Sequence, residues 1–160
     1  MTWDEYFLRM CDLVASKSKD RSTKVGCVVV SPTHEILSTG YNGFPRGVND
    51  DVETRHERPA KYMYVSHAET NATFNAARTG VSLRGATLYL RFSPGPCHDC
   101  AKAIIQSGIT EIVCNASQPF PGKGAQWDDS IRVAKEMLDE AGVLVRQVEL
   151  NEFQSSPPTN

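Results

Sequence analysis

The sequence predicts an α/β fold of three layers, α/β/α, built on a mixed five-stranded sheet. Segments rich in aliphatic and β-branched residues alternate with segments whose apolar residues recur at helical spacing. The first two strand segments follow one another directly, as in a hairpin, whereas each later strand is separated from the next by a helix. This order favours a sheet with both antiparallel and parallel neighbours, lying between helices. At 160 residues, the chain is expected to form one domain over residues 1–150.

The first part of the chain is expected to supply a helix and a β-hairpin. Residues 2–16 carry apolar side chains at helical spacing, and Thr2 and Glu5 match a capping box at the start of this helix. Residues 25–30 are apolar and β-branched, which indicates a strand covered on both faces. After a short turn, residues 35–41 are typical of the returning strand.

The remainder of the chain is expected to alternate helices and strands. The expected helices are residues 67–79, 97–107 and 128–141, and the expected strands are residues 85–92, 110–114 and 143–148. Each of these helices is followed by a glycine, which favours the left-handed conformation that ends many helices. Residues 151–160 contain Ser155-Ser156-Pro157-Pro158 and are expected to form a flexible tail.

Two connecting segments allow more than one interpretation. Residues 17–24 are polar and basic, which is consistent with a solvated loop or with a site for a small anion. Residues 44–65 lack a clear period, and a connection this long in a compact domain is functional or disordered. It ends in Tyr62-Met63-Tyr64-Val65, and this apolar run is expected to be packed against the domain.

The composition indicates a soluble protein of the reducing cytoplasm. The net charge of −2 argues against a broad surface for nucleic acid or membrane. No apolar run has the length of a transmembrane helix, and the N-terminal residues do not match a signal peptide. Cys11, Cys27 and Cys114 lie in apolar segments and are expected to be buried free thiols.

Two short motifs contain the residues best suited to chemistry. His67 and Glu69 form His-x-Glu, and Cys97 and Cys100 lie in Pro-Cys-x-x-Cys. One imidazole and two thiolates supply the protein ligands of a catalytic zinc, which keeps one position for water and acidifies it. Glu69 is too close to His67 to be a natural further ligand and is placed to act as acid and base. The two motifs together match the known signature of zinc-dependent nucleobase deaminases.

Each motif also has a plainer interpretation. Cys-x-x-Cys alone is found in redox pairs and in halves of structural zinc sites. Ser66 and Glu69 match a capping box, in which Glu69 would only fasten the start of a helix. A structural zinc would need one more protein ligand, which His56, His98 or Cys114 would have to supply. The combination of the two motifs favours a catalytic zinc.

The chain resembles the deoxycytidylate (dCMP) deaminases of the cytidine-deaminase superfamily from about residue 3 to residue 148. Three stretches carry the likeness: Lys24-Val25-Gly26 leading to Gly40-Tyr41-Asn42-Gly43-Phe44-Pro45, then His67-Ala68-Glu69-Thr70-Asn71-Ala72, and finally residues 96–109. The zinc motif identifies the superfamily, and Gly-Tyr-Asn-Gly-x-Pro identifies the dCMP branch. The resemblance implies a cytidine-deaminase-like fold, one catalytic Zn²⁺ per chain, and hydrolytic deamination of dCMP to dUMP with release of ammonia.

The resemblance also suggests roles for individual residues. Glu69 is expected to move protons from the attacking water to ring N3 and to the departing amine. Asn42 is expected to bind the sugar of the substrate. The 5′-phosphate needs cations, for which Arg21 and Lys24 are the candidates. His98, between the two cysteines, would face the nucleotide or lie exposed at the end of a helix.

The resemblance further implies a homohexamer that dCTP with Mg²⁺ activates and dTTP inhibits. Backbone N–H groups of a glycine-rich turn bind phosphate, and carboxylates bind Mg²⁺ alongside phosphates. The segment after residue 40 combines both features, so its candidates for effector binding are Gly43, Arg46, Asn49, Asp50 and Asp51. An ordered surface loop or an oligomer contact is the plainer interpretation of this segment.

Other functions remain compatible with the motifs. The same zinc site would serve a deaminase of dCTP or of a 5-modified dCMP. A tRNA adenosine deaminase fits less well, because the chain has an acidic balance and no basic C-terminal stretch. An alternative of another class is a nucleotide-binding protein with a structural zinc and no catalysis.

Overall fold

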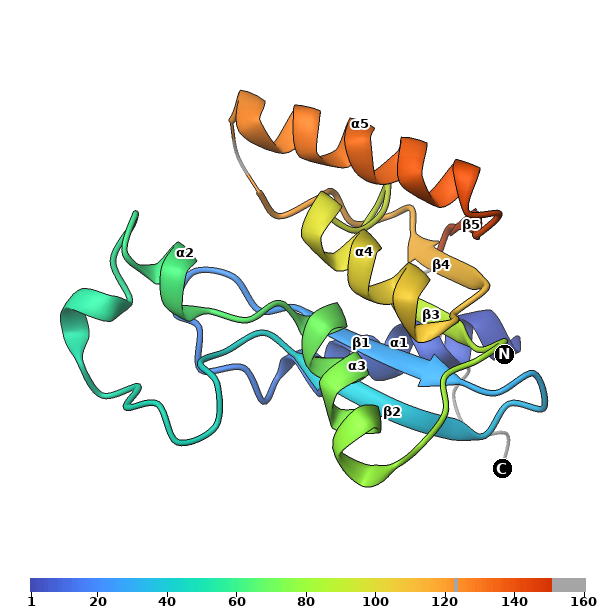
Figure 1. Cartoon of the computed structure of the whole chain (residues 1–160), viewed down its shortest axis with the longest axis horizontal. Coiled ribbons are helices and arrows are strands. Elements are labelled where there is room, and N and C mark those ends of the chain that lie inside the picture. The colour runs from blue at the N-terminus through green and yellow to red at the C-terminus, as the bar shows by residue number, and fades with distance from the viewer. Residues whose placement is uncertain (123, 151–160) are drawn as a thin grey trace, which may run out of the picture.

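A mixed five-stranded sheet with helices on both faces forms the centre of the molecule (Figure 1). The computed structural model describes residues 1–122 and 124–150, so the tail expected at residues 151–160 lies outside the described residues. The strands are β1 (Gly26–Val30), β2 (Ile36–Tyr41), β3 (Thr87–Leu90), β4 (Glu111–Asn115) and β5 (Leu144–Val148). The helices are α1 (Trp3–Ala15), α2 (Lys61–Tyr64), α3 (Ala68–Thr79), α4 (His98–Ser107) and α5 (Ala125–Glu140), and a 3₁₀ turn, η1, spans Glu53–Arg55.

The strand order, β2-β1-β3-β4-β5, combines antiparallel and parallel pairing. β1 runs antiparallel to β2 and to β3, whereas β3, β4 and β5 are parallel. Gly26 pairs with Tyr41 and Cys27 pairs with Leu90, so the start of β1 lies beside the ends of β2 and β3. The predicted α/β/α fold with a mixed sheet is confirmed.

The two faces of the sheet are covered by different helices. α1 lies on one face, and α3, α4 and α5 lie on the other (Figure 1). Val28 and Val30 belong to the core cluster beneath α1, whereas Cys27 and Val29 belong to the cluster beneath α3 and α4. Every residue of β1 is buried, as expected for a strand covered on both faces.

Two glycines let helices approach the sheet closely. A β-carbon on Gly40 of β2 would lie 2.0 Å from the carbonyl oxygen of Ala68 and 2.5 Å from the backbone nitrogen of Ala72, both in α3. A β-carbon on Gly26 of β1 would lie 2.3 Å from the carbonyl oxygen of Cys11 in α1. The first turn of α3 is therefore held against the edge of the sheet.

The element boundaries differ from those expected by a few residues. The capping box of Thr2 and Glu5 forms as predicted. α3 and α4 each begin one residue later than predicted, because His67 and Cys97 are N-cap residues with extended backbones. α5 begins at Ala125, before the expected residue 128. None of the helices in the described part of the chain is long and apolar enough to cross a membrane.

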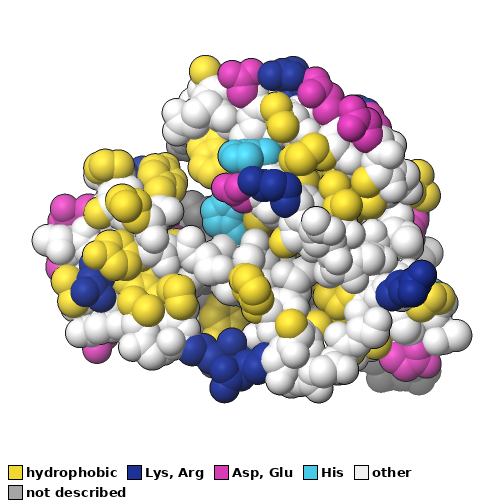
Figure 2. Space-filling view, viewed as in Figure 1, with side chains coloured by type: hydrophobic (Ala, Val, Ile, Leu, Met, Phe, Trp, Pro, Cys, Tyr) yellow, Lys and Arg dark blue, Asp and Glu magenta, His cyan; other side chains and the backbone are white. Residues whose placement is uncertain are grey.

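The connection between β2 and α3 contains local structure that the sequence did not predict. It includes η1 and the single-turn helix α2. The prediction that its apolar end is packed was wrong, because Tyr62 is 46% exposed and Met63 is 89% exposed. Hydrophobic side chains gather on the surface over this end of the molecule, where α2 and η1 lie (Figures 1 and 2).

Candidate active site

His67, Cys97 and Cys100 come together at the starts of α3 and α4. The Nδ1 atom of His67 lies 3.4 Å from the Sγ atom of each cysteine, and the potential ligand atoms all lie within 4.8 Å of one another. Typical zinc bond lengths and a tetrahedral angle would place such a nitrogen and sulfur about 3.6 Å apart. The geometry of these side chains therefore fits a Zn²⁺ ion.

The fold explains why these side chains meet. β2 and β3 run in the same direction, so their carboxyl ends lie at the same end of the sheet, beside the start of β1. α4 follows β3 after a short connection. Cys97 is the N-cap residue of α4, and Cys100 lies in its first turn. His67 is the N-cap residue of α3. The positive ends of two helix dipoles thus meet where thiolate charge is needed.

The protein groups of the cluster already favour an ionised sulfur. Hydrogen bonding from Cys100, followed by that from His67, lowers the pKa of Cys97 to about 4 against the opposing effect of burial. The hydrogen bond with Cys97 raises the pKa of His67 to about 9. The hydrogen bond with Cys97 and burial raise the pKa of Cys100. A bound cation would favour deprotonation of all three groups, as ligation requires.

Glu69 is buried beside the cluster and does not cap a helix. Its side chain lines the same cavity as His67 and Cys97, and the residue is 3% exposed. Burial raises the pKa of its carboxyl group, although the charge of His67 opposes this effect. The backbone N–H of Ser66 donates to Gly43, and the α3 N-cap has no side-chain hydrogen bond, so the capping-box interpretation is wrong.

The structural-zinc interpretation lacks its further ligand. His56 Nε2 bonds the carbonyl oxygen of Asp50, and Cys114 donates to the carbonyl oxygen of Pro94. Within residues 1–122 and 124–150, the one group of three or more His, Cys, Asp or Glu side chains placed to hold a metal is the His67/Cys97/Cys100 cluster. The arrangement therefore favours a catalytic over a closed site.

A cavity of about 460 Å³ connects the metal-ligand cluster to a polar end. Its middle section has an aromatic wall of Phe92, Phe120 and Trp127, in which Phe120 lies 5.2 Å from Phe92 and 5.4 Å from Trp127 between ring centroids. The indole N–H of Trp127 is buried and has no acceptor in the described part of the protein. A planar base with an oxygen substituent would fit this wall, since rings stack on rings and the N–H needs an acceptor.

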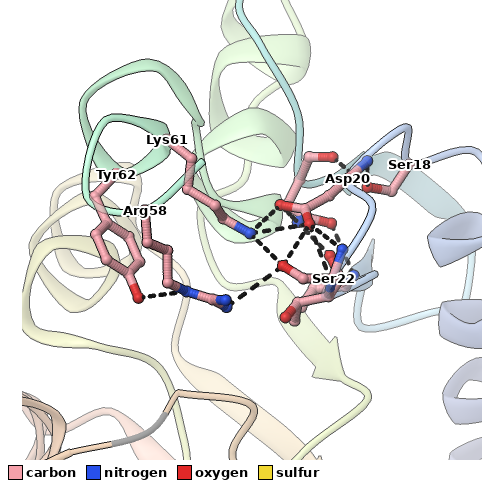
Figure 3. A network of polar contacts seen from close by, with 9 residues as sticks. Ser18, Asp20, Ser22, Arg58, Lys61 and Tyr62 are labelled. Atoms are coloured by element: carbon pink, nitrogen blue, oxygen red, sulfur yellow. Dashed lines mark hydrogen bonds and ion pairs between the residues drawn. The ribbon is translucent and has the colours of Figure 1, made fainter. Parts of the chain in front are cut away.

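The polar end of the cavity is built from two segments that are far apart in the sequence. Asp20 and Ser22 come from the connection before β1, whereas Arg58 and Lys61 come from α2 and the residues before it (Figure 3). Lys61 Nζ lies 2.7 Å from Asp20 Oδ2, and the side chains of this ion pair are 8% and 5% exposed. Burial opposes ionisation of Asp20, but the bond from Lys61 and the backbone N–H groups of Ser22 and Thr23 outweigh it and lower its pKa.

Asn42 lines the cavity and is fully engaged with its neighbours. Its Oδ1 accepts from the backbone N–H of Val25 at 2.8 Å, and its Nδ2 donates to the carbonyl oxygen of Thr23 at 2.8 Å and to Asp20 Oδ2 at 3.4 Å. Asn42 therefore fixes the polar end of the cavity, and its contact with a sugar stays a prediction.

The other residues expected to bind substrate lie outside the cavity. Arg21 is exposed and pairs with Glu53, and neither Arg21 nor Lys24 belongs to the cavity lining. His98 Nδ1 lies 2.7 Å from the hydroxyl of Ser130 in α5, and His98 is also absent from the lining. The placement of His98 favours its helix-end interpretation. Residues 17–24 are not simply a solvated loop, because Asp20, Ser22 and Thr23 line the cavity while Arg21 and Lys24 do not.

The residues expected to bind an effector are spread along the loop. Gly43 forms a two-way backbone bridge with Ser66, and Arg46 donates to Asn75 of α3 at 2.7 Å. Asn49 accepts from the backbone of Asp51. Asp50 pairs with Lys19 at 2.7 Å, and effector binding by these residues stays a prediction.

Sequence reasoning missed Asp20, Arg58, Lys61 and Trp127 as cavity residues. One signal was present in the sequence, because an Asp side chain often accepts from the backbone N–H two residues on, and Asp20 does so from Ser22 and also from Thr23. The two cations lie in a segment without periodicity, and no local pattern indicates which of its charges face the cavity.

Known proteins resemble this chain over most of its length. Residues 1–116 match the family described as the cytidine and deoxycytidylate deaminase zinc-binding region. Human deoxycytidylate deaminase is 36% identical over 152 residues, which cover 92% of this chain and 80% of the human protein. The deoxycytidylate deaminase of Enterobacteria phage T2 is 36% identical over 166 residues, which cover 79% of this chain and 86% of the phage protein.

Solved structures give the same result. The dCMP deaminase of cyanophage S-TIM5 in complex with dCMP and dUMP is 28% identical, with a TM-score of 0.69 and coverage of 90% of this chain and 95% of that one. The apo form of the same enzyme is 29% identical to this chain, with a TM-score of 0.67, and the match covers 91% of this chain and 96% of that one. The resemblance to dCMP deaminases is therefore confirmed, and the chain belongs to the cytidine and deoxycytidylate deaminase family of enzymes.

Proposed function

We propose that this protein, through a domain of residues 1–150, hydrolyses dCMP to dUMP and ammonia. The observation that carries the proposal is a single cavity that joins a His/Cys/Cys cluster and a buried glutamate to a polar end containing arginine and lysine. Relatives named deoxycytidylate deaminase, and a structural relative in complex with dCMP and dUMP, support this choice of substrate.

The protein groups suit the proton transfers of this reaction. Zn²⁺, held by His67 Nδ1 and the sulfurs of Cys97 and Cys100, would supply Lewis acidity and an acidified water. Glu69 accepts a proton from the attacking water and passes it to ring N3. It then takes the remaining proton of the hydroxyl added at C4 and passes it to the amine, which leaves as ammonia as the C4 carbonyl forms. Its burial supports this role, because a carboxyl group with a raised pKa holds a proton more readily near neutral pH. The aromatic wall orients the base and excludes bulk water.

The test is an ammonia-release assay against dCMP, dCTP, CMP, deoxycytidine and 5-substituted dCMPs. Glu69→Gln is expected to keep close to one zinc per chain while losing roughly 100- to 10,000-fold in turnover. Cys97→Ser is expected to lose zinc as well, and the exposed Glu140→Gln is the matched control. Near wild-type turnover by Glu69→Gln, or no activity of the wild type on dCMP, would contradict the proposal.

We also propose that the enzyme forms a homohexamer in which dCTP with Mg²⁺ activates and dTTP inhibits. The loop that would bind the effector is joined to the site, because Gly43 bridges to Ser66, the residue before His67. The exposed hydrophobic residues Val48, Tyr62, Met63 and Tyr64 on the same segment would be buried in such an assembly. A cytoplasmic location fits the free thiols of Cys11, Cys27 and Cys114.

A further inference from the structure

We propose that Arg58 binds the 5′-phosphate of the substrate and that the buried Asp20–Lys61 pair holds this phosphate subsite in place. This inference rests on the proposed function, since it names the residues that would recognise the nucleotide. It replaces Arg21 and Lys24 as the phosphate ligands expected from the sequence.

The lining of the cavity limits the choice of cation. Arg58 and Lys61 are the arginine and lysine residues among the described residues that line it. A dCMP molecule with its ring beside the His67/Cys97/Cys100 cluster would extend its phosphate along the cavity, away from the reacting carbon. The polar end with Arg58 and Lys61 is therefore the region in which a phosphate would meet positive charge.

Lys61 has no hydrogen-bond donor left for a ligand. An ammonium group has three N–H bonds, and Lys61 Nζ donates to Asp20 Oδ1 at 2.9 Å, to Asp20 Oδ2 at 2.7 Å and to Ser22 Oγ at 2.7 Å. The carboxylate of Asp20 also compensates the positive charge of Lys61 within a buried ion pair. Lys61 is therefore a positioning residue.

Arg58 has N–H groups that are free to bind a ligand, and its positive charge is not compensated. Of the five N–H bonds of a guanidinium, Nε donates to the hydroxyl of Tyr62 at 2.9 Å, and Nη2 makes a long contact of 3.4 Å with the hydroxyl of Ser22 (Figure 3). Both partners are neutral, and no carboxylate in the described part of the chain forms an ion pair with Arg58. At this end of the cavity, Asp20, Lys61 and Arg58 leave one uncompensated positive charge, which suits a phosphate.

The ion pair fixes the segment opposite Arg58. Asp20 Oδ1 accepts from Lys61 and from the backbone N–H groups of Ser22 and Thr23 at 2.9 and 3.0 Å. Ser22 Oγ in turn accepts from Lys61 and lies next to the Arg58 guanidinium. One hydrogen-bond network therefore joins residues 20–23 to α2. Arg58 lies just before α2 and contacts residues 20–23 through Ser22.

The experiment compares dCMP with deoxycytidine, which differ in the phosphate. For Arg58→Ala, kcat/KM on dCMP should fall about 10- to 100-fold, as expected for loss of a charge-assisted hydrogen bond, while kcat/KM on deoxycytidine stays within about twofold. Arg58→Lys should recover part of the loss. Calorimetry measures the binding of dUMP and of deoxyuridine without turnover. Arg58→Ala should weaken the binding of dUMP and leave that of deoxyuridine unchanged.

Two other arginines complete the design. Arg78 is exposed on α3, away from the cavity lining, so Arg78→Ala is the matched control. Equal loss on dCMP and deoxycytidine in Arg58→Ala, or loss of the preference for dCMP in Arg21→Ala and not in Arg58→Ala, would overturn the inference. A wild type that prefers neither dCMP over deoxycytidine nor dUMP over deoxyuridine would overturn the nucleotide specificity of the proposed function itself, whatever Arg58→Ala does.

Discussion

The buried pair of Asp20 and Lys61 joins two distant segments and contributes to stability through both partners. With either partner removed, the other charge stays buried without compensation. Lys61→Met is therefore expected to lower the free energy of unfolding by about 3–5 kcal/mol. Lys19→Met is the matched control, because Lys19 pairs with Asp50 at the surface, where solvent screens the pair and its loss should change the unfolding free energy little. Urea unfolding at neutral pH measures both changes.

The pH dependence of this pair has a defined sign. The pKa of Asp20 is lowered in the folded protein, so its contribution is fully present above the unfolded value near about pH 4 and is lost as the pH falls through the lower folded pKa. The difference in unfolding free energy between wild type and Lys61→Met should shrink as the pH falls below about 4. A difference that stays constant between pH 7 and pH 3 would show that Asp20 is not the partner responsible.

The residues best predicted from the sequence are those whose roles depend on local spacing. His67 and Glu69 lie two apart, and Cys97 and Cys100 lie three apart, so a short motif places each pair. Arg58 and Lys61 differ in this respect, because their roles depend on which of them Asp20 neutralises. That choice is made by a contact across 41 residues of sequence, which no local pattern contains.

At the scale of elements, α3 depends on the absence of a side chain at Gly40. A β-carbon there would meet the backbone of Ala68 and Ala72, so Gly40→Ala must displace the first turn of α3. Such overpacking costs about 1–3 kcal/mol, and it would move His67 away from the cysteines. We expect a lower melting temperature and a lower zinc content per folded chain, measured by elemental analysis.

Gly26→Ala is the control for this prediction. It creates a similar clash, 2.3 Å from the carbonyl oxygen of Cys11, but between β1 and α1 on the other face of the sheet. It should lower the melting temperature while zinc content stays close to one per folded chain. Equal zinc loss in both variants would mean that general destabilisation, and not displacement of α3, releases the metal.

The elements with clear periodicity were predicted well, and the connection between β2 and α3 was not. The strands and the longer helices have apolar patterns that packing alone explains. α2 is a single turn in which Lys61 is the buried residue, Met63 is exposed and Tyr62 lines the cavity, so its apolar pattern does not mark a segment packed into the core. The position of α2 is fixed by the ion pair between Lys61 and Asp20, a polar contact that a hydrophobic pattern does not reveal.

At the scale of the whole molecule, the loop of residues 42–65 is attached to the active site at both ends. One end bridges Gly43 to Ser66, and the other carries Lys61. If dCTP with Mg²⁺ binds this loop, the response to dCMP should become less sigmoidal, and dTTP should have the opposite effect. Saturation curves with each triphosphate, for wild type, Arg46→Ala and the control Arg78→Ala, measure this, and light scattering measures the assembly.

The expected result is a hexamer whose sigmoidal curve dCTP straightens in wild type and Arg78→Ala but not in Arg46→Ala. Hyperbolic wild-type curves unmoved by either triphosphate would contradict the regulation and leave the catalytic proposal intact. A monomer would contradict the assembly.

The position of Trp127 gives the protein an internal optical probe. The chain has two tryptophans, of which Trp3 is 53% exposed on α1 and Trp127 lines the cavity with its ring 6.3 Å from that of His67. A change in the indole emission on adding a nucleotide would therefore report from Trp127, once Trp3→Phe has removed the other fluorophore. Occupancy of the cavity then becomes visible in solution without a label, a coupled assay or turnover.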